Sequence, residues 1–427
     1  MRNRIVWARL LGLTDAVVED VVLDDNDVGG GIVAHVRPTA RQRLRCGRCL
    51  RRCPRYDRGS GRRRWRHLDA GLLMVWIEAE APRVSCRDCG VVTCHIPWAR
   101  AGAGHTTDFD HQVAWLATHS SRTTVATLIR VAWRTVGAIV TRVWNDIEAT
   151  VDRFAGIRRI GIDEISYKKG HKYLTVVVDH DTGRLLWAGV GRDTETVDEF
   201  FETLGPERAA QITHVSADAA PWIARSVAAH CPHAIRCADP FHIVAWAVDA
   251  MDQVRRDAWN DAAGRRRGVR STGRGAKGQA RQLKNTRWAL WKNPEDLTTG
   301  QQAKLAWIVK TDPTLWRAYL LKEGLRHVFK VKGTAGKAAL DRWLSWAARC
   351  RIPYFLDLAR KIRRHRAEID NTLDHGLSNA LIESMNTKIR QIARTAYGFA
   401  DPEALIALAL LAHAGHRPHL PGRTTHT

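Results

Sequence analysis

RRIGIDEIS at residues 158–166 opens the stretch that decides the fold, which continues with KYLTVVVDHDTG (172–183), RLLWAGVGR (184–192) and ITHVSAD (212–218). Each segment is rich in β-branched residues and is followed by turn-forming residues, a pattern typical of strands. TVDEFFETL (196–204) and WIARSVAAHCP (222–232) have helical periodicity, and AIRCADPFHIV (234–244) predicts a fifth strand. The stretch therefore predicts three strands joined by tight turns, and then two strands separated by helices.

This order predicts a mixed sheet, antiparallel at its start and parallel after the crossovers, as in an RNase H-like fold. Asp163 ends the first expected strand and Asp218 ends the fourth, and these strands are central neighbours in that fold. Two adjacent carboxylates repel each other, and a divalent cation removes that cost. Oxygen ligands favour Mg²⁺ or Mn²⁺. The alternative role for either aspartate is that of an ordinary turn or cap residue.

A third carboxylate follows a long, largely helical region. LSNALIESMNTKIRQIARTAYGF (377–399) reads as a helix in which Glu383 comes early, with Ser378 and Asn379 as possible caps. Asn386 and Arg390 lie three and seven residues after Glu383, which puts them on the same face. The alternative is that Glu383 is an ordinary surface residue.

Six of the nine cysteines lie between Cys46 and Cys94. Two Cys-x-x-Cys pairs can close one tetrahedral thiolate site around a structural Zn²⁺. The four predicted ligands are Cys46, Cys49, Cys86 and Cys89. Cys53, Cys94 or His95 could replace one of them, and a disulfide framework is the alternative to a metal. The intervening WRHLDAGLLMVWIEAEAPRVSC (65–86) predicts two strands of a hairpin.

The charge balance favours a polyanionic partner, because 67 Lys and Arg against 44 Asp and Glu give a net charge of +23. The basic residues cluster at 41–66 and 265–287, where we expect contacts with double-stranded DNA, although an arginine-rich composition is an alternative cause. An apolar share of 45% excludes wholesale disorder, and we expect no membrane span and no signal peptide. The candidate DNA-binding residues of the two clusters are Arg51, Arg52, Arg62, Arg63, Arg64, Arg265, Arg266 and Arg267.

Residues 105–147 change to helical periodicity, in short segments that fit a helix-turn-helix. Its third helix would be the reader, with Arg134, Thr135 and Arg142 facing DNA. Any small helical bundle gives the same pattern, so this assignment depends on its place between a zinc module and a catalytic pattern.

Four motifs together resemble the ISL-three (ISL3) family of bacterial insertion-sequence transposases. They are GIDE around Asp163, VSAD around Asp218, D-P-F-H at 239–242, and S-N-x-x-I-E-S-x-N-x-K-I-R at 378–390. The resemblance covers nearly the whole chain and implies a DDE transposase with Asp163, Asp218 and Glu383 as its metal-binding triad. It implies supporting roles for Asp239, His242, Asn386 and Arg390, and Asp239 competes with Asp218 for the second catalytic place.

The resemblance also implies an organisation and partners. We expect a homodimer or higher oligomer on DNA, in the bacterial cytoplasm and associated with the nucleoid. Two alternatives remain: a DNA-binding regulator without catalysis, and an RNase H-like nuclease without strand transfer. The expected regions are a zinc-binding N-terminal region (1–100), a helix-turn-helix (101–150), the first part of the catalytic domain (151–244), a helical insertion (245–375), the glutamate helix with the end of the catalytic domain (376–412) and a flexible tail (413–427).

Overall fold

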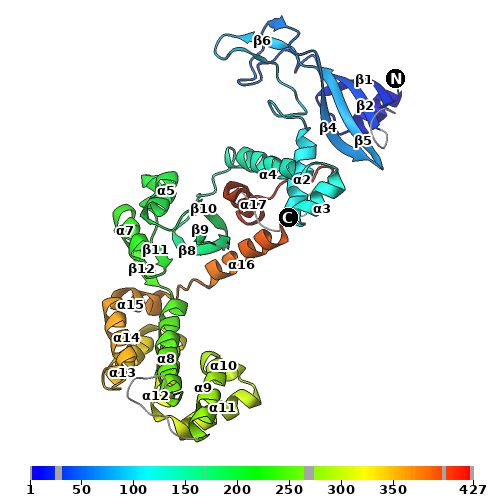
Figure 1. The fold of residues 1–427 in the computed structure, drawn as a ribbon. Helices are drawn as coiled ribbons and strands as arrows, with labels where there is room; N and C mark the ends of the chain where they lie inside the picture. The colour runs from blue at the N-terminus through cyan, green and yellow to red at the C-terminus, as the bar shows by residue number, and fades with distance from the viewer. Residues whose placement is uncertain (1, 25–30, 169, 264–273, 397–400, 424–427) are drawn as a thin grey trace. The chain divides into compact units, whose positions relative to one another are not determined.

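The computed structural model describes residues 2–24, 31–168, 170–263, 274–396 and 401–423 (Figure 1). The chain divides into two units. The first combines Met1–Arg153 with Gln391–Thr427, and the second is Phe154–Arg390. Among the described residues, no single helix is long and apolar enough to cross a membrane, and one bent pair of helices passes that test by length and composition only.

The N-terminal part of the first unit holds two sheets. A helix, α1 (Arg2–Leu10), precedes a four-stranded sheet of order β1-β2-β5-β4, and a three-stranded sheet has the order β3-β6-β7. The expected hairpin is confirmed, because β4 and β5 pair antiparallel. Val75, Ile77 and Ala79 alternate along β5 and are fully buried, as the two-residue period of a strand requires. The strands are β1 (Ala16–Asp24), β2 (Gly31–Pro38), β3 (Arg55–Asp57), β4 (Arg62–Ala70), β5 (Leu73–Glu80), β6 (Arg83–Cys86) and β7 (Gly90–Thr93).

Three helices follow: α2 (Thr107–Ala117), α3 (Arg122–Ile129) and α4 (Trp133–Glu148). Thr106 and Ser121 cap the first two with side-chain hydrogen bonds. Arg130 adopts the left-handed conformation (φ 59°) after α3, and α4 then leaves at 102°. A short turn between two helices at this angle is the geometry of a helix-turn-helix.

The C-terminal segment completes this same unit. Helix α17 (Pro402–His413) packs against α4 and is buried along most of its length. We expected residues 376–412 to close the catalytic domain and 413–427 to form a flexible tail; by their contacts, residues 376–390 group with the second unit and residues 391–427 with the first. Within the described part of that tail, the His419 ring lies edge-on to His111, with 6.4 Å between centroids.

The second unit is built on a five-stranded sheet of order β10-β9-β8-β11-β12. The first three strands are antiparallel, and β11 and β12 add in parallel to β8, so the mixed RNase H-like sheet is confirmed. Helices α5 (Thr194–Leu204), α6 (Pro206–Ala209) and α7 (Pro221–His230) make the crossovers (Figure 1). The strands are β8 (Arg159–Lys168), β9 (Lys172–Asp179), β10 (Leu185–Val190), β11 (His214–Ala217) and β12 (Ile235–Ala238).

Two strand limits differ from expectation. β8 does not end at Asp163 but continues to Lys168, because its antiparallel partner β9 extends the ladder beyond the end of β11. The fifth strand stops at Ala238, since Asp239 caps α8 (Pro240–Ala262) and Pro240 is fixed in a helical first-turn conformation. The motif Asp239–His242 therefore opens a helix.

The long region after β12 is helical, as expected, and has a core of its own. Trp343 is buried there and its indole nitrogen donates to the Leu321 carbonyl at 2.7 Å, so this tryptophan is structural. After it, α16 (Ala380–Thr395) returns toward the sheet and carries Glu383. The helices between are α9 (Arg274–Asn285), α10 (Arg287–Trp291), the 3-10 helix η1 (Pro294–Asp296), α11 (Thr299–Thr311), α12 (Pro313–Val331), α13 (Gly333–Ala348), α14 (Pro353–Arg364) and α15 (Arg366–His375).

Candidate functional site

Three aspartates form a row across the parallel half of the catalytic sheet. Ala217 of β11 is aligned with Ile162 of β8 on one side and with Ala238 of β12 on the other. Each of these three residues is followed in the chain by an aspartate, so the three aspartates lie one residue beyond the same aligned position. Neighbouring strands are about 4.8 Å apart, which places the backbones of these residues side by side. The row consists of Asp163, Asp218 and Asp239.

His242 neutralises part of this row from the first turn of α8. Its Nδ1 donates to Asp239 Oδ2 at 2.8 Å and lies 2.5 Å from Asp218 Oδ1. Burial alone would lower the pKa of His242, but its contacts with the two carboxylates raise that pKa to about 10. The imidazole is therefore a cation between two anions.

Helix α16 is seated on β8 by a close contact between a glycine and an isoleucine. A Cβ atom at Gly161 would lie 2.2 Å from Ile382 Cδ1, so only glycine permits this approach without displacement. One turn further along the helix, Asn386 Nδ2 donates to Asp163 Oδ2 at 2.8 Å. Gly161 and Asp163 of β8 thus contact Ile382 and Asn386 of α16, respectively.

Glu383 comes directly after Ile382 and is half-buried beside the row. Burial, and then the charges of Asp239 and Asp218, raise its pKa, while His242 and Arg390 act in the opposite direction. Burial also raises the pKa of Asp163 to about 7, with Asp218 contributing in the same direction. Clustered carboxylates with raised pKa values are the environment that a divalent cation stabilises.

The side chains of the candidate site residues are not equally close to one another. Among the described residues, ligand atoms of Asp218, Asp239 and His242 lie within 4.8 Å of one another, and Asp163 and Glu383 fall outside that group. Both nevertheless interact electrostatically with it.

A buried hydrogen-bond chain that the sequence did not reveal fixes the start of α16. The Asn379 amide N–H donates to Asp239 Oδ1 at 3.3 Å, and its side-chain oxygen accepts from Ser216 Oγ at 2.5 Å. Ser216 in turn lies 2.6 Å from His180 Nε2. Asn379 was expected to cap its own helix, but its side chain bonds across to β11. His180, Ser216 and Asn379 are far apart in sequence, so no local pattern signals that they are partners.

The four predicted zinc ligands converge in the first unit. The thiols of Cys46, Cys49, Cys86 and Cys89 all lie within 4.8 Å of one another, and Cys49 Sγ is 3.6 Å from Cys86 Sγ. A zinc–sulfur tetrahedron places its sulfur atoms about 3.8 Å apart, so the residues fit this metal. Backbone N–H groups of Asp88 and Cys89 lower the pKa of the Cys86 thiol to about 6, which favours the thiolate.

The expected DNA-binding arginines differ in what they contact. Arg62 and Arg64 share the Glu78 carboxylate at 2.7 and 2.8 Å, and Arg51 pairs with Asp88 at 2.6 Å. Arg52 and Arg134 are exposed and Thr135 is half-buried, and Arg265, Arg266 and Arg267 lie outside the described residues.

Arg142 forms an ion pair between two helices of the first unit. It pairs at 2.8 Å with Asp110, which is fully buried in α2, and so fixes α4 to α2. Asp110 also pairs with Arg100 at 2.9 Å. The Arg142 side chain remains 30% exposed, so the DNA-facing role expected for it stays a prediction.

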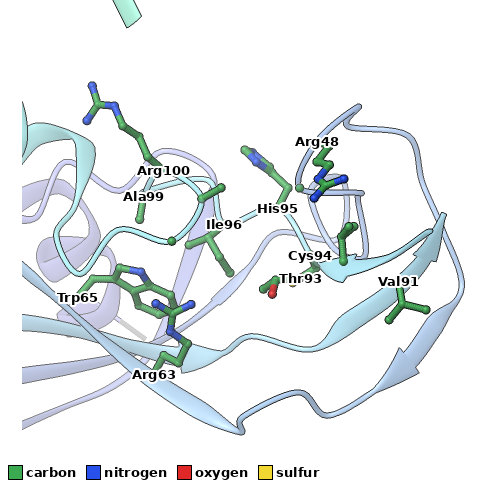
Figure 2. Close-up of a pocket in the computed structure, with 14 residues that line it drawn as sticks. Arg48, Arg63, Trp65, Val91, Thr93, Cys94, His95, Ile96, Ala99 and Arg100 are labelled. Carbon is green, nitrogen blue, oxygen red and sulfur yellow. The ribbon is translucent and has the colours of Figure 1, made fainter. Parts of the chain in front are cut away.

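A cleft of about 330 Å³ lies beside the zinc knuckle, and the described residues that line it include no acid (Figure 2). Arg63 lies over the Trp65 ring, 5.3 Å from its centroid, at one end of the view, and Arg48 stands near the other end. Arg48 was not among the predicted DNA-binding residues, although its position inside the first Cys-x-x-Cys turn places it next to the four-cysteine cluster. The lining residues are Gly47, Arg48, Arg63, Trp65, Val91, Val92, Thr93, Cys94, His95, Ile96, Ala99, Arg100, Ala101 and Gly102.

Comparison with known proteins shows to which family this chain belongs. A model described as a transposase, of the DDE type in family ISL3, matches residues 160–409, more than half of the chain. The chain belongs to transposase family ISL3. Two further ISL3-type models match it: a helix-turn-helix domain at residues 94–144 and a transposase zinc-finger at residues 42–89.

Named relatives of this ISL3 transposase support the same conclusion. A transposase for insertion sequence element IS1557 from Mycobacterium tuberculosis (strain H37Rv) is 60% identical, covering 100% of this chain and 99% of the relative. A transposase for insertion sequence element IS1001 from Bordetella parapertussis is 28% identical over 88% of this chain and 90% of the relative. The protein is thus a DNA-binding enzyme of transposition with a zinc-finger module and a divalent-metal-dependent catalytic domain.

Proposed function

We propose that Asp163, Asp218 and Glu383 hold two divalent ions, Mg²⁺ or Mn²⁺, and that this site cuts and joins the ends of an insertion sequence. The observation that carries the proposal is the row formed by Asp163, Asp218 and Asp239 with Glu383 beside it. Bound divalent cations would supply positive charge to the attacking and leaving oxygens of a phosphodiester. Asn386 holds Asp163 in place through its hydrogen bond.

The exposure of the two competing aspartates supports Asp218 as the second ligand. Its side chain is 28% exposed, which leaves its oxygens accessible to an ion and to DNA. Asp239 is 2% exposed, and its Oδ1 accepts from the backbone N–H groups of Phe241 and Asn379. In this proposal Asp239 is a positioning residue that fixes His242 and the start of α16.

For the first unit we propose one structural Zn²⁺ held by Cys46, Cys49, Cys86 and Cys89. The four-thiol cluster supports this, and a full set of four sulfurs leaves no open position for catalysis. Cys53 and Cys94 are buried outside the cluster and keep a packing role.

The proposed contacts to the inverted-repeat ends come from the basic cleft of Figure 2 and the start of α4. Arg48 and Arg63 in the cleft have no carboxylate partner among the described residues, and Arg134 and Thr135 lie in the first turn of α4. Arg51, Arg62 and Arg64 would contact phosphates only by exchanging their present acidic partners. The protein would work on the nucleoid in the cytoplasm as a dimer or larger assembly, because two ends must be brought together.

The test uses the full-length protein and a plasmid that carries both ends of the element. Mg²⁺-dependent nicking at the ends is expected, and Asp163→Asn should abolish it while end binding, measured by gel shift, is retained. Nicking without joining to target DNA would identify a nuclease, and no nicking by the unaltered protein would identify a regulator. Normal cleavage by Asp163→Asn would overturn the assignment.

A further inference from the structure

An arginine outside the proposed metal site has an unusually constrained side chain. The Arg192 guanidinium carbon lies 4.8 Å from the centroid of the Tyr173 ring and 5.4 Å from that of Trp222. Its Nε contacts Glu164 Oε2 at 3.0 Å. Trp222 Nε1 donates to the other oxygen of the same carboxylate, Oε1, also at 3.0 Å. Glu164 therefore holds the arginine and one of its aromatic supports.

Two of the residues that hold Arg192, Glu164 and Trp222, are close in sequence to residues of the candidate active site. Glu164 follows Asp163 in β8, and Trp222 lies in the first turn of α7, four residues after Asp218. The Glu164 side chain is 15% exposed and interacts electrostatically with Asp218 and His242. Arg192 is thus linked to the acidic row through Glu164, in the same unit of the chain.

The arginine keeps an accessible edge. Its side chain is 44% exposed, and in the described part of the chain Glu164 is its only carboxylate partner, through Nε. Among the described residues, the terminal nitrogens of the guanidinium form no ion pair, so they can donate hydrogen bonds to an anion. Stacking on aromatic rings fixes the guanidinium plane, which reduces the entropy lost when it binds a planar or tetrahedral anion.

We propose that Arg192 binds a backbone phosphate of the DNA strand next to the scissile bond. The metal-free cluster of carboxyl groups carries negative charge that repels DNA, so the strand needs a fixed cation close to it. Glu164, Tyr173 and Trp222 are positioning residues that hold this cation in one orientation. The inference rests on the proposed metal site, because that site defines which bond is cut.

The test compares Arg192→Ala and Arg192→Lys with Arg225→Ala, which removes an exposed arginine from the same helix as Trp222. Full-length protein is titrated with a duplex carrying one end of the element, without divalent metal, over a range of salt concentrations. Arg192→Ala should weaken binding about tenfold and reduce the salt slope by about one, as loss of one phosphate contact does. Arg192→Lys should recover the slope but only part of the affinity, and Arg225→Ala should change neither.

A second measurement locates the phosphate. Single methylphosphonates, which remove one backbone charge, are placed along the strand on either side of the cleavage point. One position should weaken binding by the unaltered protein and have no further effect on Arg192→Ala. Equal effects at all positions in both proteins, or an unchanged salt slope, would overturn the proposal. Because binding is measured without metal, Asp163→Asn tests the metal site separately, through its cleavage activity alone.

Discussion

Asn386 donates a hydrogen bond of 2.8 Å to Asp163 across 223 residues of sequence. Both side chains are buried, and the Asn386 oxygen has no hydrogen-bond partner among the described residues. The bond ties the helix that carries Glu383 to the strand that carries Asp163. The geometry of the candidate active site therefore depends on a residue that need not touch metal or DNA.

Removal of this bond should reduce catalysis more than DNA binding. Asn386→Ala is expected to lower the rate of end cleavage about 10- to 100-fold, the range typical of groups that orient a metal ligand. Ser384→Ala, at an exposed position of the same helix, is the control. Rates are measured by single-turnover cleavage, and an Asn386→Ala enzyme as fast as the control would exclude the positioning role.

Gly161→Ala should displace α16 from β8, because the added methyl group would overlap Ile382. We expect a loss of about 1–3 kcal/mol of unfolding free energy, as for other overpacked contacts, together with slower cleavage. Ile382→Ala alone removes buried contacts and costs about 2–5 kcal/mol. Denaturant titrations of the double variant should show a cost well below the sum of the two, and simple additivity would contradict the close contact.

Serine substitutions should separate the zinc ligands from the other cysteines. Cys46→Ser or Cys86→Ser is expected to abolish tight zinc binding and to destabilise the first unit, since metal binding and folding are coupled in such modules. Cys53→Ser and Cys94→Ser should retain one zinc per chain, measured by plasma emission spectrometry. Zinc loss in Cys94→Ser would show that the ligand set includes that residue.

Alanine substitution of the two adjacent arginines Arg63 and Arg64 should have different effects on DNA affinity and on stability. Arg63 lines the basic cleft, so Arg63→Ala is expected to weaken end binding about tenfold and to reduce its salt dependence. Arg64 pairs with Glu78 and Asp24 at 2.8 and 2.9 Å, so Arg64→Ala should mainly affect stability. Gel-shift titrations and thermal unfolding measure both, and equal losses of affinity would contradict this division.

His67 should make the first unit sensitive to acid. Burial lowers its pKa to about 4, so the folded state keeps it neutral while the unfolded state binds a proton below about pH 6.5. The stabilisation that depends on neutral His67 is fully present above about pH 6.5. As the pH falls from 6.5 toward 4, protonation of His67 in the unfolded state lowers the unfolding free energy by at most about 3 kcal/mol. His67→Gln cannot titrate, so the difference in unfolding free energy between the two proteins should narrow with falling pH; a constant difference would contradict the assigned pKa.

The sequence predicted the parts of the site that depend on strand order. Asp163 and Asp218 were expected to be neighbours because their strands are central neighbours in an RNase H-like sheet, and the parallel pairing of Ile162 with Ala217 confirms that the strands are adjacent. The contacts between Gly161 and Ile382 and between Asp110 and Arg142 were not predictable in this way. They join segments far apart in sequence, and neither hydrophobic periodicity nor spacing encodes which long-range partner a side chain meets.

The division of the chain also has a consequence for synthesis on the ribosome. Helix α17, with Leu405, Leu408 and Leu411 buried, packs on α4 of a unit that begins at the N-terminus. That unit stays incomplete until the whole catalytic unit has been translated and has left the exit tunnel. A chain that stops before α17 therefore lacks part of the core of its first unit, so this unit can complete its packing only at the end of translation.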